Sequence, residues 1–183
     1  MKLQIAAVVA LALVPVAALA TTVQYRTDEE MFALADAVIV GHVWREAVSN
    51  ESGMIRSRYE IQVQESLKSA GERVGDYIVV QTLGGEAPEL GGGEYVAGSP
   101  HPQPGADVIM FLQRHGKEYS VLSMGLGHFE IRYNAQLHRY FTHRDLASLA
   151  LVRKGPSEVL IPEDQLASEV LEKLRKLSAE RAQ

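Results

Sequence analysis

The chain has 183 residues, with 18 lysines and arginines, 23 aspartates and glutamates, and no cysteine. Its formal net charge of −5 argues against binding to nucleic acid, because surfaces that follow phosphates are basic. The lack of cysteine excludes thiol chemistry, disulfides and thiolate metal sites, so burial of apolar surface has to supply the stability.

The first twenty residues have the layout of a secretory signal peptide. Lys2 precedes the apolar run Ile5–Leu19, and Ala18 and Ala20 form an A-x-A cleavage site. Pro15 interrupts a run that is already shorter than the roughly 20 residues of a membrane-spanning helix, so removal is favoured over retention as an anchor. The sequence therefore predicts export to the periplasm or the extracellular space, with no stable membrane insertion after cleavage.

Residues 21–34 are expected to form a polar lead that ends in a short helix. Thr27 can cap this helix, and Glu30, three positions later, can complete a capping box. The predicted helix runs through Leu34.

Signals for β-strands begin directly after this helix. The nearly unbroken apolar run Ala37–Val43 is rich in β-branched residues and short enough for a core strand. A loop is predicted at residues 50–53. Apolar and polar residues then alternate over Tyr59–Val63, which predicts a strand with one buried and one solvent-exposed face. Tyr77–Leu83 is a third predicted strand, and it ends at Gly84.

The segment from Gly84 to Gly105 is rich in glycine and proline, a composition that predicts a long loop without regular structure. Loops of this length in a compact domain are usually functional or disordered. We therefore expect this loop to contact a partner. The candidate partner-binding residues are Gly84, Gly85, Glu86, Ser99, Pro100 and His101.

The second half of the β region predicts two further strand pairs. Val108–Leu112 and Glu118–Met124 read as a hairpin, and Phe129–Tyr133 reads as a strand that turns into Leu137–Phe141. Residues 35–141 would then hold six or seven strands, enough for a small barrel or sandwich.

Residues 142–183 are expected to form a C-terminal helical extension. Thr142 can cap a helix through Val152, and Pro162 suits the first position of a second helix. Four apolar residues then recur at helical spacing: Leu166, Val170, Leu174 and Leu177. A helix packed across the barrel or its open end is favoured over one that binds a partner.

Six histidines are the only candidate metal ligands or general bases: His42, His101, His115, His128, His138 and His143. None stands in an H-E-x-x-H arrangement, and no two are neighbours on one helix face. Because zinc needs three or four convergent ligands, a histidine metal site is the less favoured interpretation.

Other catalytic patterns are equally weak. Ser99 and His101 are close in sequence, but no G-x-S-x-G turn presents a serine nucleophile. The glycine clusters lack the Lys-Ser/Thr of a phosphate-binding loop, and the acidic residues show no recognisable pairing. The sequence therefore predicts no catalytic residue, no metal ligand and no cofactor.

Three stretches together resemble netrin-like domains, the OB-type barrel of the tissue inhibitors of metalloproteinases. They are Ala35–Val43, Arg58–Ile61 with Leu67 and Lys68, and Gly105–Leu112 with Tyr119–Val121 and Gly127–Phe129. The pattern covers residues 35–133 and is also similar to secreted bacterial proteins. The resemblance implies an OB-like small β-barrel with a short N-terminal helix and C-terminal helices, whose loops and open face bind something.

One known property of that family cannot apply to this chain. In the animal inhibitors an N-terminal cysteine chelates the zinc of the protease, and this chain contains no cysteine. The expected function is that of an exported non-enzymatic binding module of unknown ligand, whose partner is an exported protein such as a protease. The alternatives are a histidine-dependent metal-binding envelope protein or enzyme, and a purely structural envelope component.

Overall fold

The computed structural model describes residues 21–71, 73–152 and 164–181. The expected signal peptide and Pro162 lie outside these residues. The fold is mainly β, with eight strands in its main sheet. These strands are β2 (Ala37–Glu51), β3 (Met54–Ser69), β4 (Tyr77–Leu83), β7 (Asp107–His115), β8 (Glu118–Val121), β9 (His128–Asn134), β10 (Arg139–His143) and β12 (Asp164–Leu166).

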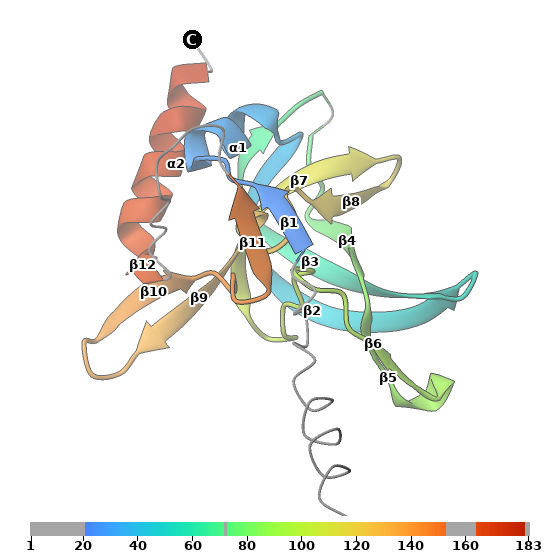
Figure 1. Cartoon of the computed structure of the whole chain (residues 1–183). Coiled ribbons are helices and arrows are strands. Elements are labelled where there is room, and N and C mark those ends of the chain that lie inside the picture. Colours follow the sequence, from blue (N-terminus) through green and yellow to red (C-terminus); the bar gives the residue numbers. More distant parts are fainter. Residues whose placement is uncertain (1–20, 72, 153–163, 182–183) are drawn as a thin grey trace, which may run out of the picture.

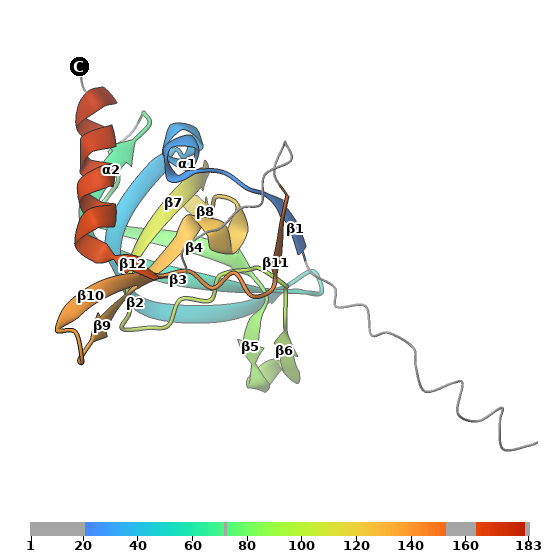
Figure 2. The same ribbon diagram turned by 60° about the vertical axis from the view of Figure 1, so that its left-hand side comes forward.

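Five of these strands close into a ring. The sheet order is β12-β10-β9-β7-β2-β3-β4-β8, and β7 pairs a second time with β8. The ring therefore consists of β7, β2, β3, β4 and β8, while β9, β10 and β12 extend the sheet beyond it (Figure 1). Two helices, α1 (Asp28–Leu34) and α2 (Ala167–Arg181), contribute to one apolar cluster against this sheet (Figure 2). Neither helix combines the length and apolarity that crossing a membrane requires.

The apolar run of β2 is continuous because both of its faces are buried. Ala37, Ile39 and Val43 belong to a cluster built from all five strands of the ring. Val38 and Val40 point the other way, into the cluster that includes residues of α1 and α2. Unbroken apolar strands are typical of sheets covered on both sides, so the predicted core strand is confirmed.

β2 and β3 are much longer than the expected strands. They continue as one hairpin to a turn at Ser52 and Gly53, where the Gly53 N–H donates to Asn50 Oδ1 at 2.9 Å. The outer half of this hairpin is mostly polar and, apart from the buried Ser57 and Tyr59, is partly or fully exposed; ion pairs such as Arg45–Glu60 link its two strands. Because the outer halves of β2 and β3 bury little apolar surface, their sequences lack the apolar periodicity that predicts a strand.

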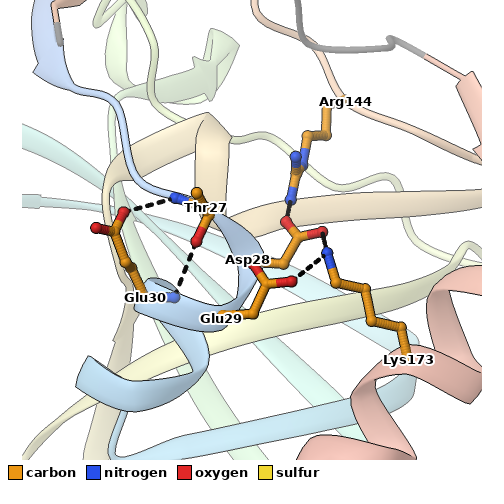
Figure 3. Close-up of polar contacts among 6 residues, drawn as sticks. All are labelled: Thr27, Asp28, Glu29, Glu30, Arg144 and Lys173. Atoms are coloured by element: carbon orange, nitrogen blue, oxygen red, sulfur yellow. Dashed lines mark hydrogen bonds and ion pairs between the residues drawn. The ribbon is translucent and has the colours of Figure 1, made fainter. Parts of the chain in front are cut away.

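The N-terminal helix and its capping box are confirmed. Thr27 Oγ1 accepts from the Glu30 N–H at 3.2 Å, and Glu30 Oε2 accepts from the Thr27 N–H at 2.9 Å (Figure 3). The next residue, Asp28, is buried and bonds to Arg144 and to Lys173 of α2. This cluster of charges joins α1, α2 and the segment after β10.

The expected helix from Thr142 to Val152 is wrong. Thr142 lies inside β10, where it is buried and its hydroxyl donates to the Gln165 carbonyl in β12. Further on, β11 (Leu149–Val152) pairs in parallel with β1 (Thr21–Gln24). The later helix is confirmed as α2, with Val170 and Leu174 buried, although Leu166 ends β12 instead of joining the helix.

The expectation of no regular structure between residues 84 and 105 is wrong for its first half. β5 (Gly85–Ala87) pairs with β6 (Gly92–Glu94), and the 3-10 helix η2 (Pro88–Leu90) joins them. Gly91 follows η2 with a φ of 90°, a left-handed conformation that glycine adopts readily. Another 3-10 helix, η3 (Met124–Gly127), occupies the end of the strand that was expected to reach Met124.

Candidate functional site

The glycine- and proline-rich segment lines a cleft of about 430 Å³ over the outer half of the β2–β3 hairpin. The hairpin contributes Glu46 from β2 and Tyr59 from β3, which are paired in register. The other lining residues come from the segment itself, among them Glu86, Glu94, Tyr95, His101 and Gln103. Two parts of the chain that are distant in sequence therefore form one concave surface.

Three hydrogen-bonded side chains line this cleft. The buried Tyr59 hydroxyl donates to Glu46 Oε1 at 2.8 Å and lies 3.5 Å from His101 Nδ1. Burial raises the pKa of the Tyr59 hydroxyl. Burial also lowers the pKa of His101, although the nearby Glu46 carboxylate partly offsets this decrease. The tyrosine and the histidine are therefore uncharged at neutral pH.

The rim of the cleft is acidic and aromatic. Glu46, Glu86 and Glu94 are exposed, and Tyr95 is 75 % exposed. Glu94 Oε2 accepts from the Ile55 N–H at 2.9 Å, which ties β6 to β3. No lysine or arginine lines the cleft among the described residues, so its potential is negative.

A second cleft of about 210 Å³ lies on the other side of the same segment. It shares Tyr95, His101 and Gln103 with the first cleft and is also lined by His128 of β9. Burial lowers the pKa of His128 to about 4. Its enclosed Nε2 has no hydrogen-bond partner among the described residues, so this imidazole stays neutral inside the protein.

The structure divides the six predicted contact residues among three places. Gly85, Glu86 and His101 line the first cleft, while Ser99 and Pro100 join His101 at the second. Gly84 lines neither cleft. Its backbone bonds to β3, since its N–H donates to the Ile55 carbonyl and its own carbonyl accepts from the Ser57 hydroxyl.

A Cβ on Gly84 would come within 2.4 Å of the Glu94 carbonyl oxygen, and its φ is +80°. Glycine at this position therefore allows the close approach of the chain to β6.

Sequence reasoning missed Glu46, Tyr59 and Tyr95. Glu46 was missed because β2 was expected to end at Val43. Counting back from the glycine turn at the end of the hairpin would have placed Glu46 opposite Tyr59, because strand register follows from the turn. Tyr95 carries no comparable signal, since its exposure depends on the path of an irregular segment.

Three of the six histidines, His101, His128 and His143, line the second cleft, and most of the six are bonded to different neighbours. His42 lies 2.8 Å from Asp107, His143 lies 2.9 Å from Asp164, and His115 lies 2.9 Å from Ser120. In the part of the chain that the structure describes, no group of three or more potential ligands is placed to hold a metal ion.

The serine that stands near His101 in sequence is also engaged elsewhere. Ser99 Oγ donates to the Leu83 carbonyl at 2.7 Å. The hydroxyl is therefore committed to the end of β4, and the pair does not form a nucleophile and base.

No known protein-family model matches this chain, and no curated protein matches its sequence. The function is therefore argued from the geometry of the cleft.

Proposed function

We propose that this protein is an exported, non-enzymatic binding module that holds a protein partner in the cleft between residues 84–105 and the β2–β3 hairpin. One observation carries the proposal: the segment brings an exposed aromatic ring, two carboxylates and His101 together with Glu46 and Tyr59 of the hairpin. Concave surfaces with a few convergent polar groups are the usual places for ligands.

The fold supports a binding role. A closed ring of five strands with long insertions between them is the general plan of OB-like barrels, of which netrin-like domains are one kind. We propose that the ring is such a barrel. Its rigid strands would then position the inserted segment between β4 and β7, as scaffolds of this type position their binding loops.

The chemistry of the rim favours a basic side chain of an exported protein as the ligand. Glu46, Glu86 and Glu94 attract a cation, and the exposed ring of Tyr95 can stack against it. The uncharged Tyr59 hydroxyl and His101 imidazole add hydrogen-bonding groups without adding positive charge. A lysine or arginine in an exposed loop of the partner fits these features.

The test is a titration of the chain from Thr21 with short peptides rich in lysine or arginine, followed by calorimetry and NMR. We expect binding by the basic peptides and none by a glutamate-rich peptide of the same length. Glu86→Gln and Tyr95→Ala should each weaken binding by about threefold to tenfold. Glu89→Gln is the matched control, because Glu89 is exposed in the same segment but does not line the cleft.

Point variants suit this test better than removal of the segment. The segment bonds to β3 through Glu94, and its Gly98 N–H donates to Ser148 Oγ at 2.8 Å, so a deletion would disturb the surrounding fold. Equal affinity for basic and acidic peptides, or no effect of Glu86→Gln and Tyr95→Ala, would contradict the proposal.

A further inference from the structure

The hairpin of β9 and β10 extends beyond the rest of the sheet. β9 pairs with β7 only as far as Ile131, and β10 pairs with β12 only from Phe141. Within the described residues, strand positions 132–134 and 139–140 pair only within this hairpin. Figures 1 and 2 both show this hairpin, in pale orange, projecting from the body of the molecule.

The tip of the hairpin is held by its own hydrogen bonds. Asn134 Oδ1 accepts from the N–H groups of Gln136 and Leu137, each at 3.0 Å. The Tyr133 hydroxyl lies 3.0 Å from His138 Nδ1 across the turn. These contacts fix Leu137 at the outer end of the hairpin.

Large apolar side chains are exposed on this tip. Tyr133, Leu137 and Tyr140 are 54 %, 59 % and 59 % exposed. Tyr133 and Tyr140 are directly opposite one another, with ring centroids 5.1 Å apart. Apolar groups gathered on a projecting element are typical of a surface that is covered in use.

Apolar side chains of the hairpin line two separate clefts. Ile131 and Tyr140 line a cleft of about 480 Å³ that reaches α2. A separate cleft of about 490 Å³ is lined by Tyr133, Leu137 and Phe141, together with polar side chains such as Arg132. The exposed apolar side chains thus surround the end of the hairpin and do not form one flat patch, so a fluid apolar phase would cover them more completely than a rigid protein surface.

The charge of the hairpin is opposite to that of the chain. Residues 131–141 contain Arg132, His138 and Arg139 and no acidic residue, while the whole chain has a net charge of −5. Arg132 is paired with Glu130 at the base of the hairpin. The side chain of Arg139 makes no hydrogen bond or ion pair within the described residues, so it is available to an external anion.

We propose that the β9–β10 hairpin docks this protein on a lipid bilayer that contains anionic lipids. Tyr133, Leu137 and Tyr140 would enter the headgroup region and the upper acyl layer, and Arg139 would contact lipid phosphates. Tyrosine is favoured at this depth because its ring is apolar and its hydroxyl is polar. The contact is peripheral and reversible, since it combines a small apolar area with few charges.

Vesicle flotation tests this proposal directly. The chain from Thr21 is mixed with vesicles of phosphatidylcholine alone, or with about 30 % phosphatidylglycerol added to supply surface charge. We expect the protein to float with the anionic vesicles only. Leu137→Ser should lower the bound fraction about fivefold and Arg139→Glu at least tenfold.

Two matched variants control for general effects on the surface. Leu34→Ser removes a leucine of similar exposure, 52 %, at the end of α1. Lys117→Glu reverses the charge of an exposed lysine in the turn between β7 and β8. Both should float as the unaltered protein does, and circular dichroism confirms that every variant folds.

Three results would overturn the proposal. They are no flotation with either vesicle, flotation that the hairpin variants leave unchanged, and hairpin-dependent binding to polyglutamate but not to vesicles. The last result would assign the hairpin to an acidic protein partner. Glu86→Gln should leave flotation unchanged, which separates this surface from the cleft of the proposed function.

Discussion

The two apolar clusters of this protein share strands β2, β3 and β7 but are stabilised differently. The cluster inside the ring is built from side chains such as Ile39, Ile61 and Met110, all of them fully buried. The cluster under the helices contains equally buried side chains, and beside it lies an ion pair between Asp28 and Arg144. The first cluster thus combines apolar packing with polar contacts of Tyr59 and Tyr119, while the second adds an ion pair between two buried side chains.

The buried charges decide how the helices attach. The Arg144 guanidinium is 4 % exposed, lies 3.7 Å from the centroid of the Phe129 ring and bonds to Asp28 at 2.5 Å. Burial opposes the positive charge of Lys173, but its hydrogen bonds to Glu29 and Asp28 outweigh this effect and raise the pKa of Lys173 (Figure 3). The hydrogen bond from Lys173 lowers the pKa of Glu29. We infer that this network fixes where α1 and α2 sit, whereas the ring does not depend on it.

The largest effect should come from breaking the buried ion pair. Asp28→Ala leaves the Arg144 guanidinium buried without a counter-ion, so we expect the free energy of unfolding to fall by about 4 kcal/mol. Urea denaturation followed by circular dichroism measures the loss.

Combining Asp28→Ala with Arg144→Met should restore much of that stability, because no unpaired charge then remains buried. If the double variant is as unstable as Asp28→Ala alone, the loss arises from packing around α1 and not from the charge.

A truncation inside the ring should cost slightly less and respond differently to salt. Ile39→Ala removes a fully buried side chain from the ring cluster, for an expected loss of about 3 kcal/mol. The loss should be the same in low and high salt, because no charge is involved. A loss below about 1 kcal/mol would mean that the ring interior is loosely packed.

The sequence alone predicted the parts of the fold that local chemistry determines. The capping box at Thr27 and the core strand from Ala37 follow from neighbouring residues, and both are confirmed. The helix expected from Thr142 was wrong because threonine occurs both at helix caps and at buried positions in strands. Its identity alone therefore does not distinguish the two. Its hydroxyl is bonded to Gln165, a partner 23 positions away that local patterns do not show.

The candidate site was predictable only in part for the same reason. Glycine and proline mark residues 84–105, and this segment does line the cleft. Glu46 and Tyr59 come from the other wall, and their proximity depends on the register of a long hairpin with little apolar periodicity. Similarly, Asp28 and Arg144 are 116 positions apart, so no local pattern connects them.

A third test concerns His128, a buried ionisable group that belongs to neither cluster. Its pKa is about 4 in the folded protein, against 6.5 as the ordinary value. Between these values the unfolded chain binds a proton that the folded chain does not, so stability should fall as the pH decreases from 6.5 towards 4. We expect a loss of about 2 kcal/mol between pH 7 and pH 5.

Urea denaturation from pH 7 to pH 5 measures how the free energy of unfolding changes with pH. His128→Gln should remove most of this pH dependence. The pKa of His101 is lowered too, so His101→Gln tests the smaller contribution from the cleft. His115→Gln is the control, because His115 is exposed. Carboxylates with lowered pKa values, such as Glu29 and Glu130, add to the loss mainly below pH 5, where the unfolded chain begins to bind protons at these groups, so the comparison is made between pH 7 and pH 5. If His128→Gln leaves the pH dependence of stability unchanged, the lowered pKa of His128 is not its cause.

The smallest effect should come from the cap of α1, where local and long-range interactions can be separated. Thr27→Ala removes the side-chain acceptor for the Glu30 N–H but leaves Asp28 and its ion pairs in place. The expected loss is about 1 kcal/mol, and Thr27→Ser should retain nearly full stability because serine is an equally good cap. If Thr27→Ala costs as much as Asp28→Ala, then the capping turn itself positions the buried charges. The two clusters would then differ less in their energetics than the contacts of Asp28 indicate.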